Sequence, residues 1–268
     1  GKHTERKSVA ESFLSGHGSP FVAQVSLANS GTLYKAIMDG LYYRGTAFFQ
    51  TYTPCMPEHG IPDYAAELQA LRSRDSRGMP EFVFNPTLGE TYMDALDVKS
   101  NQSYQTDWAT KLAPVTKKRY TYTVAHWAFT EARFRFHHKI VKPEAVEGMI
   151  SLEDKLKLIT MDDIINRRHT DPNHRSYIPD FGVYTIDYDE NGNEVYHTLS
   201  IQMVLFAVER RKAWRMLQSR AGVINKEYEE QKALLAKIDT EGKSIDEAIE
   251  ELAHAFNVSV INRVGVDD

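Results

Sequence analysis

Three side chains that can do chemistry lie within five positions of one another: Cys55, Glu58 and His59. They follow residues 47–53, whose aromatic and threonine side chains are typical of a β-strand. Three prolines and a glycine between positions 54 and 62 then oppose any regular element. Because ligands of α/β proteins bind beyond the carboxyl ends of the strands, this loop is the predicted functional site.

Cys55 admits three interpretations. A single cysteine is most often a small buried hydrophobe. A rigid loop after a strand instead favours a metal or cluster ligand, because such a ligand needs a thiolate held in a fixed direction. A catalytic pair of Cys55 with His59 is the third interpretation, and Pro57 between them makes that pairing awkward. For Glu58 and His59, loop solubility and backbone capping compete with a role at the site.

Composition narrows the class of protein. The chain has 268 residues, of which 42% are hydrophobic and 26% charged, an ordinary balance for a globular protein. No run approaches the length of a membrane span, and a net charge of −5 does not favour nucleic-acid binding. One cysteine excludes an intrachain disulfide and indicates a reducing, cytoplasmic location. The opening GKHTERKS has no apolar signal region and suggests a piece of something longer.

The first 86 residues have the pattern of an α/β fold. The expected elements are helices over 5–15, 32–43 and 63–73 and strands over 21–27, 47–53 and 81–85. Two strands joined by one helix form a βαβ unit, whose crossover should be right-handed. Asp63 is the expected N-cap of the third helix.

Residues 87–268 are expected to form a mostly helical C-terminal extension. Its expected elements are an irregular surface segment over 87–118, helices over 122–139, 151–158, 162–168, 201–220, 226–238 and 244–256, and a hairpin at about 182–199. Asn191-Gly192 is the turn of that hairpin, which must pack on the 201–220 helix or on another subunit. Arg133 and Arg135 in the aromatic, basic 122–139 segment could bind nucleotide or coenzyme A phosphates, or lie on the solvated face of a core helix.

The order of short motifs in residues 1–62 resembles the 2-oxoacid:ferredoxin oxidoreductases. The matching stretches are Phe21–Leu27, a helix, Tyr43-Arg44-Gly45, Tyr52-Thr53-Pro54-Cys55 and His59-Gly60. They are similar to the second part of the thiamine-diphosphate-binding domain, so the resemblance implies part of a doubly wound fold. It also implies that Cys55 is the last of four ligands to the [4Fe–4S] cluster nearest the thiamine, with Glu58 and His59 around that cluster.

The resemblance implies an activity as well. That activity is thiamine-dependent oxidative decarboxylation of a 2-oxoacid, with coenzyme A taking the acyl group and iron–sulfur clusters passing electrons to ferredoxin or flavodoxin. The sequence lacks the Gly-Asp-Gly motif for Mg²⁺ and thiamine diphosphate, the Asn-Thr-Gly-Gly segment and the other three cysteines.

These departures set limits on the assignment. The chain by itself is not expected to be the catalyst. We expect it to be part of a larger polypeptide or one chain of a split, oligomeric enzyme. A non-catalytic assembly or docking subunit of such a complex is the alternative. Residues after Asn85 match no part of the family.

Overall fold

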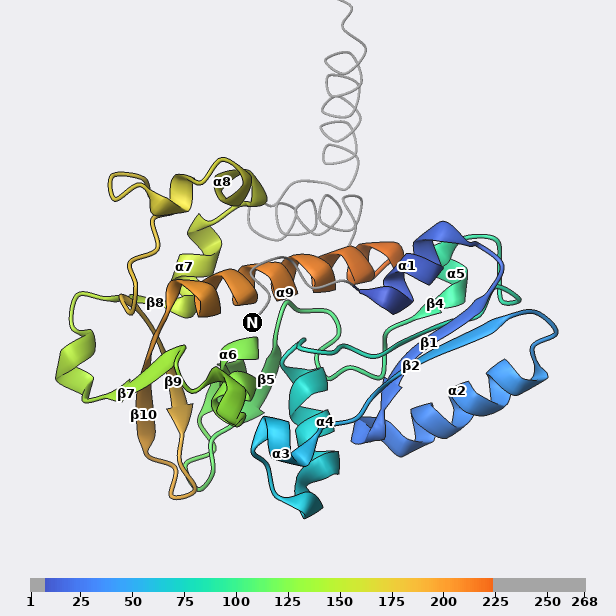
Figure 1. Ribbon diagram of the computed structural model, residues 1–268, viewed down its shortest axis with the longest axis horizontal. Coiled ribbons are helices and arrows are strands. Elements are labelled where there is room, and N and C mark those ends of the chain that lie inside the picture. The colour runs from blue at the N-terminus through green and yellow to red at the C-terminus, as the bar shows by residue number, and fades with distance from the viewer. Residues whose placement is uncertain (1–7, 224–268) are drawn as a thin grey trace, which may run out of the picture. The chain divides into compact units, whose positions relative to one another are not determined.

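A computed structural model describes residues 8–223 of the chain (Figure 1). The helices predicted over 226–238 and 244–256 lie outside the described residues. The described elements include two four-stranded sheets, a two-stranded sheet and a 20-residue helix, so the α/β class is confirmed. No helix among residues 8–223 is long and apolar enough to cross a membrane.

The N-terminal sheet has the strand order β2-β1-β3-β4. Its elements are α1 (Val9–Gly16), β1 (Phe21–Ser26), α2 (Ser30–Tyr42), β2 (Ala47–Tyr52), α3 (Met56–His59), α4 (Ala66–Asp75), β3 (Phe82–Phe84), α5 (Tyr92–Ala95) and β4 (Leu96–Asp97). β1 and β2 are parallel, in the register Phe21 with Ala47, which confirms the βαβ unit. β3 and β4 are antiparallel to their neighbours, so the sheet is mixed.

The apolar stripe of α2 does not face the sheet. Ala36 and Gly40 are the buried positions, whereas Tyr34, Ile37 and Leu41 are 67%, 40% and 73% exposed. A side chain at position 40 would place its Cβ 2.3 Å from the Phe49 ring, so the glycine lets the helix lie close to the strands. The periodicity therefore predicts the helix correctly, while these three large side chains lie on the outer surface and Leu33 packs against the sheet.

Asp63 does not cap α4. A short 3₁₀ turn over Asp63–Ala65 comes first, and Ala65 is the residue at the N-cap of α4. Pro62 precedes the turn, and its fixed φ of −63° directs the chain into it. The predicted N-cap role of Asp63 is therefore wrong.

The second four-stranded sheet has the order β7-β10-β9-β8. The remaining elements are β5 (Ala109–Leu112), β6 (Arg119–Tyr122), α6 (Val124–Phe129), β7 (His138–Val141), β8 (Ile150–Ser151), α7 (Leu152–Leu158), α8 (Met161–Ile165), β9 (Val183–Tyr188), β10 (Glu194–Leu199) and α9 (Ile201–Arg220). The predicted hairpin is confirmed as β9 and β10, with Gly192 in the left-handed region at φ 81°. The predicted 201–220 helix is α9.

Two expectations for the extension are wrong. Residues 122–139 do not form one helix: α6 ends at Phe129, and His138 begins a strand paired with Leu199 of β10. Pairing with the hairpin overrides the helical spacing of the aromatic residues. The segment over 87–118 is not a surface excursion, because it contains the buried Trp108 and Ala109.

Helix α9 contributes to both main cores (Figure 1). Met203 and Val204 pack with Val183 and Leu199 of the hairpin in one cluster of buried residues. Farther along the helix, Trp214 joins a second cluster with the N-terminal strands. The hairpin thus has its packing partner within the chain. Residues on both sides of the predicted 86/87 boundary share the second cluster, and a separate fold for residues 1–86 stays a prediction.

A pair of histidines lies between α6 and the second sheet. His197 is buried and stacks on Phe129, with ring centroids 3.9 Å apart and an interplanar angle of 7°. Its Nδ1 lies 3.2 Å from Nδ1 of His138, so one nitrogen must donate and the other accept. Burial, together with the nearby His138 and His126, lowers the pKa of His197 to about 3. The ring is therefore neutral in the fold.

We predict that His197 makes the fold sensitive to mild acid. An unfolded histidine binds a proton below about pH 6.5, whereas the folded His197 does so only near pH 3, so stability falls as the pH falls between these values. Between pH 7 and pH 5 the loss from this one group is about 2 kcal/mol. Urea titrations across this range should show a flatter pH dependence for His197→Gln. The exposed His17→Gln is the control, and an unchanged slope for His197→Gln would contradict the assignment.

Candidate functional site

The predicted functional loop follows the carboxyl end of β2, as expected. Ser26 of β1 is paired with Tyr52 of β2, so both parallel strands end at the same edge of the sheet, and Cys55 lies three residues farther on. The loop is not wholly irregular, because Met56–His59 form the single helical turn α3. Pro57 is tolerated there, since the first turn of a helix needs no N–H hydrogen bond from it.

The three chemistry-bearing side chains of the loop separate into two groups. Cys55 is a free, exposed cysteine, which excludes the small buried hydrophobe. Glu58 is also exposed, whereas His59 is only 8% exposed. The His59 backbone N–H donates to the Cys55 carbonyl at 2.9 Å, whereas the buried Nδ1 of its ring has no hydrogen-bond partner among residues 8–223. The structure therefore offers no support for a Cys–His catalytic pair.

His59 faces a buried carboxylate that the sequence analysis did not single out. Glu131, which follows α6, is 2% exposed, and its Oε1 lies 3.5 Å from Nδ1 of His59. The same oxygen accepts a hydrogen bond from Gln69 Nε2 of α4 at 2.9 Å and from the Tyr52 hydroxyl at 3.4 Å. One carboxylate thus contacts the end of β2, the turn α3 and the helix α4.

The charge of Glu131 is balanced by Arg133. The Arg133 Nε donates to the other carboxylate oxygen, and its guanidinium lies 5.3 Å from the Trp127 ring centroid. Burial lowers the pKa of His59, with Arg133 acting in the same direction and Glu131 and Glu58 opposing it. Burial, then the charge of Glu131, raises the pKa of Tyr52. Arg133 therefore serves as the counter-ion of Glu131, which removes the support for phosphate binding by this arginine.

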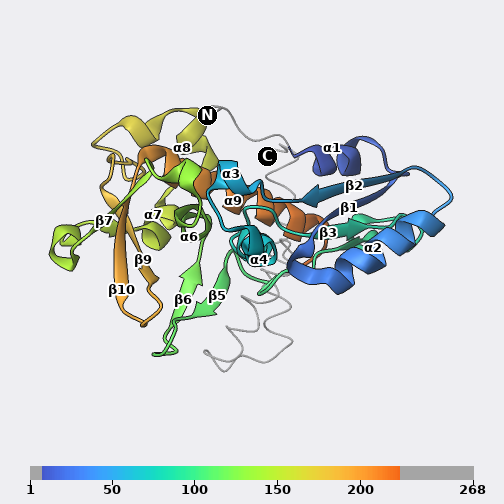
Figure 2. The ribbon, with the colours of Figure 1, turned by 60° about the horizontal axis from the view of Figure 1, so that its bottom comes forward.

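The backbone of the loop also fits closely against the segment after α6. Gly60 has φ 64°, and a Cβ built on it would lie 2.6 Å from the Cβ of Ala132. Figure 2 shows α3 beside α4 and α6, where the N-terminal sheet meets the remainder of the described chain. Residues 130–133 thus pack against the Cys55 loop, although they are distant from it in the sequence. A glutamate in an aromatic run with an arginine two positions later was the only local signal for this contact.

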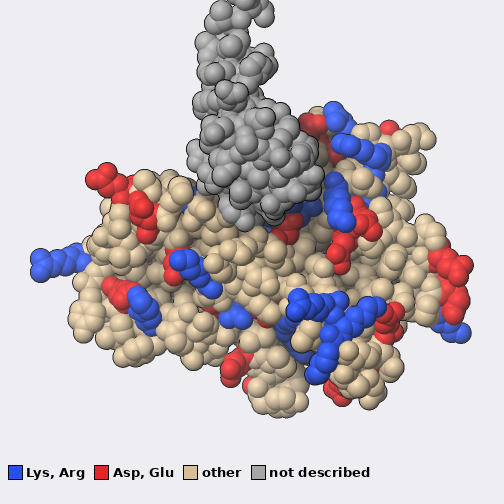
Figure 3. All heavy atoms as spheres, turned by 180° about the vertical axis from the view of Figure 1, so that it is seen from behind, with Lys and Arg blue, Asp and Glu red and all other residues tan. Residues whose placement is uncertain are grey.

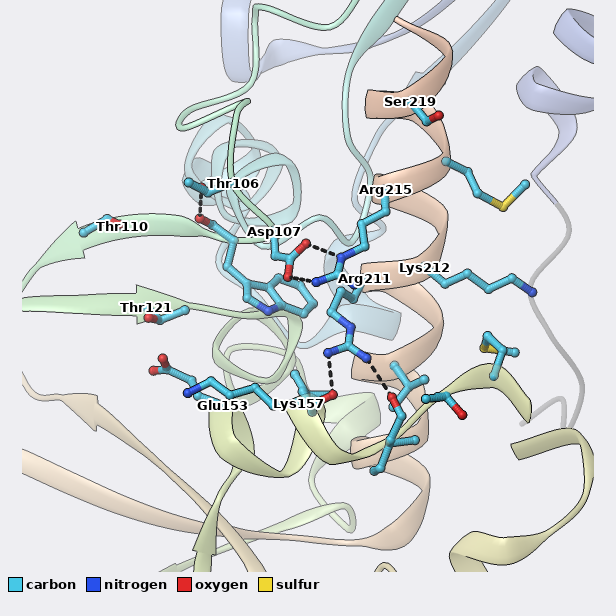
Figure 4. Close-up of a pocket in the computed structure, with 17 residues that line it drawn as sticks. Thr106, Asp107, Thr110, Thr121, Glu153, Lys157, Arg211, Lys212, Arg215 and Ser219 are labelled. Atoms are coloured by element: carbon cyan, nitrogen blue, oxygen red, sulfur yellow. Dashed lines mark hydrogen bonds and ion pairs between the residues drawn. The ribbon is translucent and has the colours of Figure 1, made fainter. Parts of the chain in front are cut away.

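A cavity of about 940 Å³ lies along α9, and no residue of the Cys55 loop lines it (Figure 4). It is lined by Arg211, Lys212 and Arg215 of α9, among others, and by residues of α7 and β5. Arg215 is held by Asp107 through two contacts of 2.6 Å, and Arg211 donates to the main-chain carbonyls of Leu156 and Ile159 at the end of α7. Both guanidinium groups already have protein acceptors, which weakens this cavity as an anion site.

Acidic and basic side chains are mixed on one face of the described residues (Figure 3). On the face in Figure 3, acidic side chains lie beside the basic ones over the described residues. Residues 8–223 do not contain three His, Cys, Asp or Glu side chains grouped so that they could hold a metal ion. Cys55 can therefore serve a metal or cluster only together with ligands from elsewhere. No family model and no curated protein matches the chain.

We predict that Gly60→Ala loosens this loop. A side chain in the left-handed region costs about 1–2 kcal/mol, and the contact with Ala132 adds about 1–3 kcal/mol of overpacking. Gly148→Ala is a matched control, because Gly148 has φ 76° with no atom within 4 Å of the added Cβ. Denaturant titrations should show the larger loss for Gly60→Ala.

A second substitution separates the two causes. Ala132→Gly in the Gly60→Ala background removes the colliding methyl group and should restore part of the lost stability. Equal losses for the two glycine variants, with no recovery in the double variant, would show that the close approach does not matter.

Proposed function

We propose that this chain is part of a 2-oxoacid:ferredoxin oxidoreductase, in which Cys55 is one ligand of a [4Fe–4S] cluster. The observation that carries the proposal is the exposed thiol of Cys55, three residues beyond the end of the parallel strand β2. An exposed thiol on a supported loop can reach a cluster shared with other parts of a protein. The order of motifs around Cys55 adds the resemblance to this class of enzyme.

The residues present fit one cluster ligand and no more. A [4Fe–4S] cluster takes about four thiolates, and the sequence has one cysteine. Residues 8–223 contain no group of three or more His, Cys, Asp or Glu side chains that could hold a metal ion, and the sequence lacks the motif that binds Mg²⁺ and thiamine diphosphate in the enzymes it resembles. We therefore assign thiamine diphosphate, Mg²⁺ and three cluster ligands to other parts of the enzyme, and coenzyme A and ferredoxin or flavodoxin to the complete, cytoplasmic, oligomeric complex.

When bound, the cluster would pass electrons one at a time from the 2-oxoacid to ferredoxin or flavodoxin. This chain's contribution is to hold one thiolate in place. His59 and Gly60 support that loop from the inside, while Glu58 stays at the surface next to Cys55. The carboxylate of Glu58 adds negative charge near the proposed cluster.

The outer surface of α2 supports a place in a larger assembly. Tyr34, Ile37 and Leu41 lie three or four residues apart and form an exposed apolar stripe on α2. Apolar stripes of this kind mark interaction surfaces. The stripe also favours the second candidate function, a non-catalytic assembly subunit, and the iron content of the assembled protein distinguishes the two.

We predict that Cys55→Ser in the assembled enzyme releases or converts one cluster. A hydroxyl is a poor substitute for a soft thiolate, so iron should fall, by about one cluster equivalent if the cluster is released and by less if it is converted. Reduction of ferredoxin should then collapse, while carbon dioxide release from the 2-oxoacid persists. Low-temperature EPR with iron quantification measures the loss.

Glu58→Gln is the control for the Cys55→Ser experiment, because it changes an exposed neighbour and keeps the thiol. It should keep all iron. A Cys55→Ser enzyme with every cluster and normal ferredoxin reduction would refute the proposed function.

We also predict that residues 1–268 alone bind neither cofactor. One thiol cannot hold a four-iron cluster, and the sequence lacks the Mg²⁺-diphosphate motif. Anaerobic purification with iron analysis, and calorimetry against thiamine diphosphate with Mg²⁺, test this. Stoichiometric iron or about micromolar thiamine binding would contradict it.

A further inference from the structure

We propose that Glu131 is a positioning residue: from the C-terminal extension it fixes the Cys55 loop, acting through the His59 ring. The part of this inference that concerns cluster binding by the loop rests on the proposed function. It gives residues 87–223 a role at the site, although no motif in that part of the chain resembles the oxidoreductases.

The first argument is the burial of the carboxylate. The Glu131 side chain is fully buried, and a buried charge is stable only with a counter-ion and hydrogen bonds. Arg133 and Gln69 supply these on two sides, which fixes the position of the carboxylate. A fixed charge can orient a neighbouring dipolar ring.

The second argument is the unmet demand of His59. Its Nδ1 is buried and has no hydrogen-bond partner at ordinary distance, and the nearest charged atom is Glu131 Oε1 at 3.5 Å. This nitrogen is buried within the protein, and the Glu131 carboxylate lies beside it without forming a hydrogen bond in this structure. A small closing movement of the loop would turn the contact into a hydrogen bond.

The third argument is the way His59 is joined to Cys55. The His59 N–H donates to the Cys55 carbonyl at 2.9 Å, and the Gly60 N–H donates to Met56 at 2.9 Å. α3 is a single turn, so it has too few internal hydrogen bonds to hold itself in place. The contacts that hold this turn in place must therefore come from the segment packed against it, which contains Glu131.

If Glu131 only stabilised the fold as a whole, its loss would not act mainly on the Cys55 loop. The test therefore compares Glu131→Gln with Asp163→Asn in the full chain. Asp163 is also a buried carboxylate close to a histidine, with Oδ1 3.9 Å from His174 Nδ1, and it lies away from the Cys55 loop. Both changes remove one buried charge and keep the side-chain shape.

The readout is amide hydrogen exchange at His59 and Gly60. Glu131→Gln should raise exchange at these two amides about tenfold over the value in Asp163→Asn, because only the first change frees α3. His59→Gln should have the same local effect, and the double variant should add nothing to either single change. If Glu131→Gln does not fold, Arg133→Gln replaces it, since that side chain is the more exposed member of the pair.

Two results would overturn the inference. One is equal exchange at His59 and Gly60 in the Glu131 and Asp163 variants. The other is additivity of the Glu131 and His59 changes, because a residue that acts through His59 cannot add to its loss.

The assembled enzyme supplies a separate arm. With full iron content, Glu131→Gln should shift the EPR signature of the cluster relative to Asp163→Asn, and an unshifted signature would overturn the link to the cluster. If Cys55→Ser kept all its iron, the proposed function would fail, while the exchange comparison would still decide the role of Glu131.

Discussion

The buried carboxylate of Glu131 is the constraint on which the site depends. A charge buried this deeply must be neutralised locally. Arg133, Gln69 and His59 all lie against this carboxylate. Removing one partner of such a group leaves an uncompensated charge, which typically costs about 3–5 kcal/mol. The loop after β2 therefore cannot shift without disturbing the packing between the N-terminal sheet and the segment after α6.

A second buried charge joins the end of α4 to a different part of the later chain. Arg77 is fully buried at the end of α4, with its guanidinium 4.3 Å from the Trp214 ring centroid. It donates to the main-chain carbonyls of Gln102 and Ser103 at 2.9 Å, and the Trp214 indole donates to Thr106. α9 is thereby tied to the segment before β5. The residues around α4 are thus joined to later parts of the chain by two buried charges of opposite sign, the Glu131 carboxylate through Gln69 and the Arg77 guanidinium through Gln102 and Ser103.

The sequence predicted the elements whose signals are local. The βαβ unit, the Asn191-Gly192 hairpin and α9 all follow from periodicity and turn residues within a few positions. What could not be predicted depends on distant partners. Residues 122–139 carry a helical spacing, yet pairing with β10 makes His138 a strand residue.

The face of α2 shows the same limit. Size and hydrophobicity indicate that Ile37 and Leu41 are buried, but close approach to the sheet requires the small Ala36 and Gly40 there. For the site, the position of Cys55 beyond a strand end follows from the strand and its prolines, whereas its exposure is known only from the structure. Glu131 could not be found, because nothing near it in the sequence indicates that His59 will lie against it.

In the Cys55 loop, the side chains that could react with a partner are different from those that hold the loop in place. The thiol and Glu58 lie at the surface, where they can meet a partner, while His59 and the Gly60 backbone lie inside, where packing fixes them. A ligand to a shared cluster needs both properties, because a loop that moved would change the distance between the thiolate and the metal with every fluctuation. A surface cysteine on an unsupported loop would offer the same chemistry without the geometry. The contacts on the buried side come from residues 130–133, so in the proposed arrangement a segment without any recognisable motif supports the motif-bearing loop.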